Sequence, residues 1–394
     1  MDITKICLTG GACGGKSSSL SLIKEKLEER GYNVIIVPEV ATKIIGSGII
    51  PGRTIPVIDF QNMVLENQLF DEKMYADAAE KMFAEGKKTV LIMDRGIGDQ
   101  YAFLDKKDMD QLLANHGLTK NEALSTYDCV IHLKTAADGA LEYYQWNDPD
   151  SNEVGNNASR ITPPEEAIEQ DKITLQSWMG HPHFRVIDNS TDFNGKVARA
   201  VKEVFAVLGE PVPCEIERKF LVKMPTEGQL KSLEFHNGLS KAHITQTYLK
   251  SDSDIERRVR KRGDDIDGYV YRYTEKSPVS AGKRKEVERM IDVKEYETYL
   301  TFDKDERLAT IEKDRYCFLY KNQYFEMDIY PFDKNYAILE IELNDLEQKI
   351  ELPPELEIVR EVTNDPNYSN HSIASSITSG EYVLEEPEND ITRE

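Results

Sequence analysis

The sequence predicts two domains of different fold class: an α/β domain with a parallel sheet and helices on both faces, then an α+β domain built on an eight-stranded antiparallel barrel. Three observations predict this division. A glycine-rich loop at 10–17 lies between an apolar strand and an amphipathic helix, strands and helices alternate to about residue 209, and the remaining strands carry charges at alternate positions. With 394 residues, the chain is long enough for two cores.

Composition excludes several classes of protein. The formal net charge of −22 argues against a general nucleic-acid binder, although it is compatible with a local basic cavity. The five cysteines are scattered without a Cys-x-x-Cys pair, which indicates neither a disulfide framework nor a zinc site and favours a reducing compartment. No apolar run has the length of a membrane span. We therefore expect a cytoplasmic protein without a transmembrane segment.

The glycine-rich loop, Gly10-Gly-Ala-Cys-Gly-Gly-Lys-Ser17, fits the phosphate-binding pattern Gly-x4-Gly-Lys-Ser. Glycines let backbone N–H groups close around phosphate oxygens at a helix N-terminus, and the lysine supplies positive charge to the β- and γ-phosphates. The serine hydroxyl is a ligand for Mg²⁺ in such loops. We predict as nucleotide-binding residues Gly10, Gly11, Gly14, Gly15, Lys16, Ser17 and Ser18, with Ser17 also on the metal.

The following elements alternate as βα units, with strands at 34–37, 89–93, 129–133 and 184–187 and helices at 57–85 and 193–208. Asp94 ends the third strand, where a carboxylate reaches Mg²⁺ directly or through water; a helix N-cap is the alternative. Glu39 lies at the end of the second strand. It is either a general base or a residue that contacts the phosphate acceptor; a carboxylate in a surface loop is the alternative. We assign both residues to the nucleotide site.

The segment 147–164 is polar and rich in Asn, Asp and Pro, which is typical of a mobile lid. It carries Arg160, which we assign to the transferring phosphate; a solvated arginine is the alternative. The chain lacks an Asn-Lys-x-Asp motif, the guanine-reading signal of Ras-like proteins, so both ATP and GTP remain candidate ligands.

The first half resembles the P-loop kinase-like ATPases related to the nicotinamide riboside kinase domain. The resemblance depends on the glycine-rich loop, on Val37-Pro-Glu-Val-Ala-Thr42, on Asp94-Arg-Gly96 and on Val186-Ile-Asp-Asn-Ser190. It implies an ATPase or kinase fold with the glycine-rich loop on the nucleotide.

The breaker-rich connector Gly209-Glu-Pro-Val-Pro213 predicts a domain boundary, with a first domain at 1–209 and a second at 210–378. We predict helices near 225–234 and 293–301, and strands near 214–222, 242–250, 254–262, 268–276, 284–291, 308–320, 323–330 and 336–344. Strands at hairpin spacing favour a closed or nearly closed barrel, because closure removes exposed edges. The acidic tail 379–394 is expected to be disordered.

Side chains in a strand alternate between its two faces, so charged residues two apart share a face. For strand 284–291 two choices stay open, either Lys285, Val287 and Arg289 or Glu286 and Glu288. The other shared faces are Glu215, Glu217 and Lys219; Arg258, Arg260 and Arg262; Arg272, Thr274 and Lys276; Lys313 and Arg315; Glu326, Asp328 and Tyr330; Glu340 and Glu342.

A barrel of this size has room for one small ligand, and basic and acidic groups together inside it suit a polyphosphate with a divalent cation. A sheet whose outer surface is laced with salt bridges is the alternative. Taken with the family resemblance given in the next paragraph, these faces assign to the triphosphate Lys219, Arg258, Arg260, Lys276, Lys285, Arg289, Lys313 and Arg315; to the metal Glu215, Glu217, Asp328, Glu340 and Glu342; and to catalysis Glu215, Glu217, Lys219, Lys276, Glu286 and Glu288. Asp94, like Ser17, is assigned to the metal of the nucleotide site.

The second half resembles the CYTH domain, the triphosphate tunnel metalloenzyme fold, over residues 214–375. The match runs over Glu215-x-Glu217-x-Lys219, Gln246-Thr-Tyr248, Arg258-x-Arg260, Thr274-x-Lys276, Lys313-x-Arg315, Glu326-x-Asp328 and Glu340-x-Glu342. The resemblance implies that Glu215, Glu217 and Glu342 ligate Mg²⁺ or Mn²⁺, and that the basic residues hold a triphosphate.

The two halves together resemble the TRPL translocation defect protein 14 group, which implies nucleotide binding, with GTP as one candidate, and recognition of acidic phospholipids. Our leading hypothesis is a metal-dependent triphosphatase in the second domain beside a first domain that binds or hydrolyses ATP or GTP. The alternatives are a nucleotide-controlled module that binds phosphorylated headgroups without turnover, an adenylate cyclase and a small-molecule kinase. The oligomeric state stays open.

Overall fold

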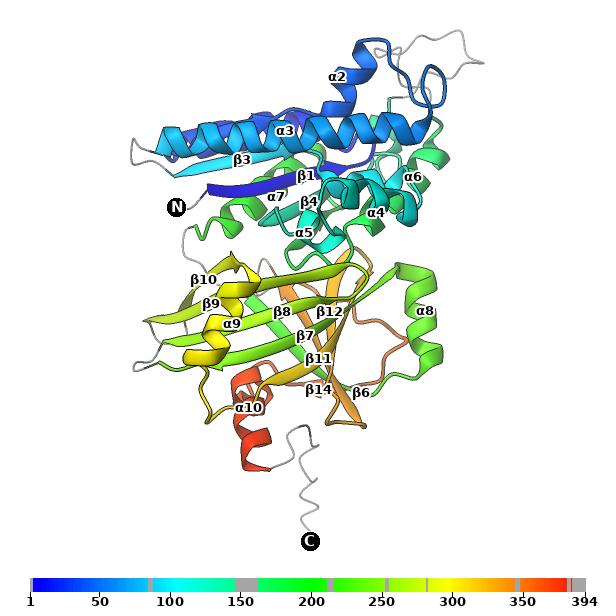
Figure 1. The fold of residues 1–394 in the computed structure, drawn as a ribbon. Helices are drawn as coiled ribbons and strands as arrows, with labels where there is room; N and C mark the ends of the chain where they lie inside the picture. The colour runs from blue at the N-terminus through cyan, green and yellow to red at the C-terminus, as the bar shows by residue number, and fades with distance from the viewer. Residues whose placement is uncertain are drawn as a thin grey trace. The chain divides into compact units, whose positions relative to one another are not determined.

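The computed structural model describes residues 3–83, 88–145, 162–210, 216–251, 255–280, 283–343, 348–380 and 384. Within these ranges, the side chains of residues 83, 236–237, 278–280 and 283–285 are not described. The chain divides into two compact units, Met1–Val212 and Pro213–Glu394 (Figure 1), which are called the first and second unit below. The division lies three residues beyond the boundary expected at 209–210.

A five-stranded parallel sheet forms the centre of the first unit, in the order β2-β3-β1-β4-β5. Parallel strands need crossover connections, and the helices between them supply these. The strands are β1 (Ile3–Gly10), β2 (Asn33–Val37), β3 (Thr89–Asp94), β4 (Cys129–Leu133) and β5 (Phe184–Ile187).

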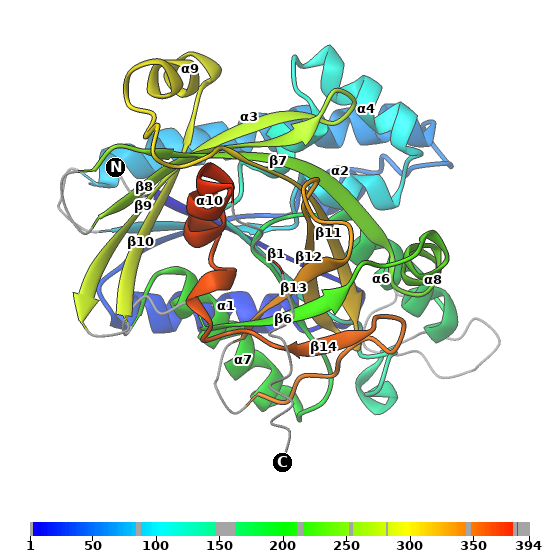
Figure 2. The same ribbon diagram turned by 90° about the horizontal axis from the view of Figure 1, so that it is seen from below.

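Helices cover both faces of this sheet, as the sequence predicts (Figure 2). One face packs against α1 (Lys16–Glu29) and α7 (Phe193–Val207), whose apolar residues join Ile6, Leu8 and Ile131 in one buried cluster. The long helix α3 (Val57–Phe83) lies on the other face. The remaining elements are α2 (Val40–Gly46), η1 (Ile97–Ala102), α4 (Lys106–Asn115), α5 (Lys120–Leu124), η2 (Leu141–Tyr143) and α6 (Pro164–Ser177).

The second unit contains a nine-stranded antiparallel sheet in the order β10-β9-β8-β7-β11-β12-β13-β6-β14. The strands are β6 (Ile216–Lys223), β7 (Leu239–Leu249), β8 (Glu256–Asp264), β9 (Gly268–Ser280), β10 (Lys283–Ile291), β11 (Ile311–Tyr320), β12 (Gln323–Ile329), β13 (Tyr336–Leu343) and β14 (Ile358–Glu361). The antiparallel class and the eight predicted strands are confirmed as β6–β13, and β14 adds a ninth strand that the sequence did not predict. Strand β14 has four residues without alternating charge, so its sequence carried no signal.

The sheet curls around an inner face (Figure 2). Charged side chains lie on this inner face, and apolar side chains pack beneath helices on the outer face. On the outside, Phe220, Leu339 and Ile341 pack with Leu233 of α8 (Glu227–Asn237). Helix α9 (Val293–Phe302) covers the outer side of β7–β10. Within the described ranges the end strands β10 and β14 do not pair, so the curl is not closed by a continuous ladder.

Helix α10 (Asn370–Ser379), preceded by η3 (Pro366–Tyr368), packs into the inner side of the curl. Its Ile373 and Ala374 join Tyr248, Ile311 and Tyr330 in a buried cluster. The same cluster contains Leu384, which lies in the tail expected to be disordered and is nevertheless buried. Residues 381–383 and 385–394 of that tail lie outside the described residues. In the described part of the chain, no helix is both long and apolar enough to cross a membrane.

Candidate phosphate-binding sites

The glycine-rich loop of the first unit packs against the end of β4. Gly10 has a φ of 136°, and a Cβ atom there would lie 2.0 Å from the carbonyl oxygen of Leu133, so only glycine fits. Helix α1 begins at Lys16 after Gly15, without a side-chain cap. The N–H groups of its first turn are therefore available to an anion, as the phosphate-binding prediction requires.

Lys16 lies across the loop. Its Nζ donates to the carbonyl oxygens of Gly10 at 2.9 Å and Gly11 at 3.2 Å. Burial, together with the nearby Arg95 guanidinium, lowers the pKa of Lys16 to about 8. A bound phosphate would supply the negative charge that this buried ammonium lacks.

Asp94 ends β3 beside Leu8 of β1. Burial and the Glu39 carboxylate raise the pKa of Asp94. Among the described residues nothing hydrogen-bonds to its buried Oδ1. The neighbouring helix η1 has Gly96 as its N-cap, so the helix-cap alternative for Asp94 is wrong. A carboxylate oxygen without a described partner fits a cation that is also bound by the exposed Ser17 at the start of α1.

Arg95 is a site residue that the sequence prediction missed. Its Nε donates to Glu39 at 2.7 Å and its Nη1 to Asp99 at 3.3 Å, while Thr42 donates to Glu39 at 2.6 Å. Arg95 and Thr42 together lower the pKa of Glu39 despite its burial. The backbone of Arg95 is left-handed, with a φ of 71°. Such a conformation is costly for a non-glycine residue and is typical of functional sites.

Glu39 therefore lies with Lys16, Asp94 and Arg95 at one edge of the parallel sheet, where the sequence placed it by strand order alone. Arg160 and most of the predicted lid lie outside the described residues, so its assignment stays a prediction.

The inner face of the second unit gathers charged side chains from seven of its nine strands. Strand alternation brings them together although they are spread over more than 120 positions in the sequence. Its basic members are Lys219, Arg258, Arg260, Arg262, Arg272, Lys276, Lys313 and Arg315, and its acidic members are Glu217, Glu256, Glu286, Glu288, Glu326, Asp328, Glu340 and Glu342.

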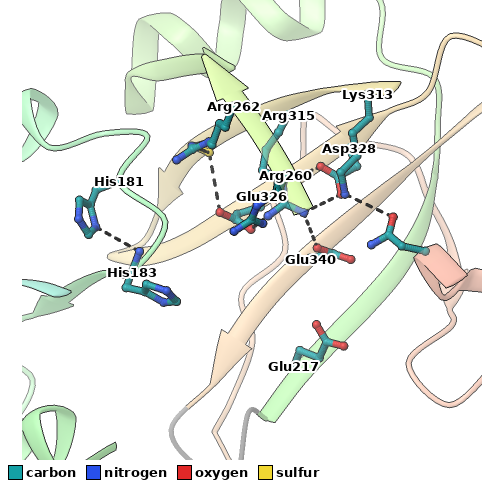
Figure 3. A network of polar contacts seen from close by, with 12 residues as sticks. His181, His183, Glu217, Arg260, Arg262, Lys313, Arg315, Glu326, Asp328 and Glu340 are labelled. Atoms are coloured by element: carbon teal, nitrogen blue, oxygen red, sulfur yellow. Dashed lines mark hydrogen bonds and ion pairs between the residues drawn. The ribbon is translucent and has the colours of Figure 1, made fainter. Parts of the chain in front are cut away.

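A continuous network joins β6, β11, β12 and β13 on this face, and Figure 3 shows its part on β11, β12 and β13. Lys313 Nζ donates to Asp328 at 2.5 Å, and Arg315 donates to both oxygens of Asp328 at 2.7 Å. Arg315 also donates to Glu340 at 2.8 Å, and Lys219 completes the chain with a 2.7 Å bond to Glu340. Asp328 has an exposed fraction of 0% and Lys313 one of 3%, so both ions are desolvated.

The pKa values of these groups follow from that pairing. Burial favours neutral carboxyl groups, but Lys219, Arg315 and Lys313 outweigh it and hold the pKa of Glu340 well below its usual range. Arg315 and Lys313 do the same for Asp328. The pairing therefore favours the ionised forms of both carboxyl groups, whereas burial lowers the pKa of Lys313.

A second network joins β8, β9 and β10. Glu288 accepts from Arg260 at 3.1 Å, from Arg272 at 2.6 Å and from Thr274 at 3.0 Å. Glu286 lies 2.6 Å from Lys276 and 3.5 Å from Arg258. The Nε atoms of Arg258 and Arg260 are buried, and no described residue bonds to them. A buried donor left without a partner is costly, and an anionic ligand is a partner that these guanidinium groups suit.

The two networks differ in charge. The strands β8–β10 contribute five basic and three acidic members to the inner face, whereas β6 and β11–β13 contribute three basic and five acidic members. Burial and the neighbouring guanidinium groups of Arg258, Arg272 and Arg315 lower the pKa of Arg260. One wall of the curl thus favours an anion and the other a cation.

The structure resolves the choice left open for β10. Glu286 and Glu288 point to the inner face, so Arg289 points outward and pairs with Glu295 and Tyr299. With an exposed fraction of 46%, Arg289 is remote from the inner face, and its triphosphate assignment is wrong. The cause is the two-residue period of a strand, which admits only one of the two sets. The side chain of Lys285 is not described, and its assignment stays a prediction.

The predicted metal ligands fall into two groups. Glu217 is 43% exposed, lies 3.2 Å from Lys219 and is in register with Glu342 on the adjacent strand β13, so the two residues are neighbours on the same face of the sheet. Glu215 lies outside the described residues. Asp328 and Glu340 instead have both oxygens engaged by basic side chains, which argues against a metal role for them. Among described residues, no three His, Cys, Asp or Glu side chains are close enough to hold a metal ion.

Comparison with known proteins supports a P-loop-type domain in the first unit, because residues 5–196 match the family described as AAA domain. No curated protein matches the chain.

Three solved structures show similarity to part of the chain. The hypothetical protein NE1496 has 30% identity and a TM-score of 0.30, covering 41% of this chain and 99% of that one. The inorganic triphosphatase NE1496 has 30% identity and a TM-score of 0.29, covering 41% and 95%. The PH1819 protein from Pyrococcus horikoshii has 16% identity and a TM-score of 0.26, covering 33% and 80%. TM-scores of this size leave fold and activity to be argued from this chain's own residues.

Proposed function

We propose that the second unit binds a triphosphate on its inner face and hydrolyses it with a divalent cation, while the first unit binds ATP or GTP at its glycine-rich loop. The observation that carries the proposal is the basic wall of β8–β10, where Arg258 and Arg260 each have a buried Nε donor without a partner among the described residues. Burying so many charges costs several kcal/mol per ion unless opposite charges compensate, and the three carboxylates of this wall balance only part of its five basic charges. A ligand with several negative charges provides that compensation.

A triphosphate suits this wall better than a single phosphate does. The basic residues Arg258, Arg260, Arg272 and Lys276 come from two adjacent strands and form a row of donors. Arginine forks bind phosphate oxygens in pairs, and lysine adds a point charge. A chain of three phosphates can contact this row at successive positions.

A divalent cation, Mg²⁺ or Mn²⁺, fits the opposite wall. The carboxylates of the neighbouring residues Glu217 and Glu342, together with the predicted ligand Glu215, would hold it. Such an ion polarises phosphoryl oxygens and lowers the pKa of bound water.

The chain's own residues do the remaining work. Arg258, Arg260 and Lys276 bind the phosphate oxygens and stabilise the charge that develops on the leaving group, so that positioning and neutralisation lower the barrier. Glu286 and Glu288 were predicted to be catalytic. Because each is held by two basic side chains, we assign them the positioning of Arg258, Arg260 and Lys276.

Crossed variants test this proposal. The purified protein with Mg²⁺ or Mn²⁺ should release phosphate from tripolyphosphate, nucleoside triphosphates or both, and Lys276→Ala should abolish that release. Lys16→Ala should abolish nucleotide binding at the first unit and leave tripolyphosphate hydrolysis unchanged. Equal loss of both activities in either variant would contradict two independent sites.

Product analysis of the same reactions decides the alternatives for the second unit. A binding module would be favoured if the natural protein binds triphosphate tightly but releases no more phosphate than the Lys16→Ala, Lys276→Ala double variant. Formation of cyclic nucleotide would favour a cyclase.

A second candidate for the first unit is phosphoryl transfer to a small molecule. The observation that favours it is the ionised Glu39 carboxylate beside Arg95, in the electrostatic reach of Lys16 and Asp94. A base at this position would accept a proton from an acceptor hydroxyl. Transfer of the γ-phosphate of ATP to a nucleoside panel, lost in Glu39→Gln with nucleotide binding intact, would establish it.

A further inference from the structure

Phe193, the first residue of α7, is an exposed aromatic side chain beside the glycine-rich loop. A Cβ atom at Gly15 would lie 3.0 Å from Cε2 of Phe193 and 3.7 Å from its Cζ. The ring edge therefore touches the residue that precedes Lys16, yet 41% of Phe193 is exposed. The apolar core of the unit does not account for this exposed position.

The ring is held on a rigid base formed by two turns. Asn189 donates to the carbonyl oxygens of Thr135 at 2.7 Å and Asp138 at 2.6 Å. The buried Lys196 of α7 donates to the carbonyl oxygen of Lys134 at 2.5 Å and to Asn189 Oδ1 at 2.7 Å. The turns after β4 and β5 are thus tied together next to the loop, and α7 is tied to both.

We propose that Phe193 is the platform on which the base of a bound nucleotide stacks, an inference that rests on nucleotide binding at the glycine-rich loop. The N–H groups at the start of α1 would bind the phosphates, so the attached nucleoside has to lie beside the loop, next to the residues that flank Lys16. The aromatic ring of Phe193 lies in that position, at Gly15. Stacking on an aromatic ring removes apolar surface of both partners from water.

Stacking on Phe193 would bind a base without a base-reading motif, which suits a chain that lacks Asn-Lys-x-Asp. A phenyl ring has no hydrogen-bonding group, so it binds every base through its π-face. We therefore expect ATP and GTP to bind with similar affinity, and both to bind more tightly than CTP or UTP because purines have the larger stacking surface.

Equilibrium binding of radiolabelled ATP to the full-length protein tests the proposal, counting only the binding that Lys16→Ala removes. Phe193→Ala should weaken ATP and GTP about tenfold, within the range measured for loss of one stacking contact. Phe193→Trp should bind at least as tightly as the natural protein, whereas Phe193→Leu, which keeps an apolar side chain, should bind as weakly as Phe193→Ala. The matched control is Phe103→Ala, since Phe103 is 47% exposed in the same unit.

Competition by tripolyphosphate separates stacking from support of the loop. Because tripolyphosphate has no base, Phe193→Ala should leave its competition for the Lys16-dependent site unchanged. Equal weakening of ATP and tripolyphosphate, or Leu and Trp variants that bind alike, would overturn the platform. If the Lys16→Ala variant retained all ATP binding, nucleotide binding at the glycine-rich loop itself would be overturned. This result differs from one that overturns only the role of Phe193.

Discussion

The two units hold their candidate phosphate sites by opposite means. In the first unit the anion site consists of backbone N–H groups of one contiguous loop, with Lys16, Glu39, Asp94 and Arg95 as the charged side chains beside it. In the second unit it consists of charged side chains brought together from seven strands. The first site leaves Asp94 Oδ1 unpartnered, whereas every oxygen of Asp328 in the second is engaged.

This difference shows how each site balances buried charge. A backbone site needs fewer buried ions than a side-chain site, so fewer charges have to be neutralised before a ligand binds. A side-chain site has to neutralise its own ions before a ligand arrives, and the paired networks of the second unit do so. Substitutions in the second unit should therefore lower its stability, whereas substitutions in the first unit should weaken ligand binding and leave stability largely unchanged.

The largest effect is expected from Asp328→Asn compared with Asp94→Asn. Removing the Asp328 charge leaves Lys313 and Arg315 short of a buried partner, which should destabilise the second unit by about 3–5 kcal/mol. Asp94→Asn removes an unpartnered carboxylate and should leave the stability of the first unit unchanged or raised, while weakening Mg²⁺-dependent nucleotide binding.

Hydrogen exchange in β11–β13 reports on the second unit, and fluorescence of the buried Trp178 reports on the first. Destabilisation of the first unit by Asp94→Asn as large as that of the second by Asp328→Asn would refute the comparison.

The next effect is expected from Arg258→Ala compared with Arg257→Ala, adjacent residues on opposite faces of β8. Arg258 lies on the inner face, whereas Arg257 is 41% exposed and pairs with Glu275 outside. Loss of one charge-stabilising donor should lower phosphate release about 10²–10³-fold for Arg258→Ala. Arg257→Ala should stay within about twofold, since exposed ion pairs contribute little. Steady-state phosphate release from tripolyphosphate measures both.

A smaller effect concerns the pH dependence of the first site. Because burial lowers the pKa of Lys16 to about 8, the ligand-free ammonium is lost as pH rises through this value. Nucleotide affinity should then fall about tenfold per pH unit above pH 8. The folded state binds fewer protons here than the unfolded chain, so the stability of the first unit should rise over the same range.

Nucleotide titrations and unfolding curves between pH 7 and about pH 9.5 measure the two opposed trends. The variant Lys16→Arg keeps its charge throughout and should show neither trend. Affinity that falls equally in this variant would assign the pH dependence to another group.

The smallest effect is expected from Arg289→Ala, on the outer face of β10. Its ion pair with Glu295 is solvent-exposed and should contribute less than about 1 kcal/mol to stability. Phosphate release should not change, because Arg289 points away from the inner face. Thermal unfolding and phosphate release check both; a loss of activity comparable to that of Arg258→Ala would restore the original assignment of Arg289 to the triphosphate.

The local sequence determined the elements whose signals are contiguous. The glycine-rich loop could be predicted from residues 10–17 alone, because phosphate binding needs specific residues at fixed spacings within these eight positions. Strand alternation likewise placed Arg258 with Arg260 and Glu340 with Glu342. Strand β14 was not predicted, because four residues without alternation carry too little pattern. The burial of Leu384 was not predicted either, because it depends on the cluster that contains Ile373 and Ala374 of α10 and not on the residues next to Leu384 in the sequence.

What only the tertiary structure decided is which face of each strand turns inward and which distant groups meet there. The alternation in β10 fits either Glu286 with Glu288 or Lys285 with Arg289, and the packing of the curled sheet selects the first set. The meeting of Arg95 with Glu39, and of Phe193 with Gly15, depends likewise on the order of strands in a sheet. Such contacts join residues far apart in sequence, so no local pattern encodes them, whereas hydrophobic burial and ion pairing in the folded chain fix them.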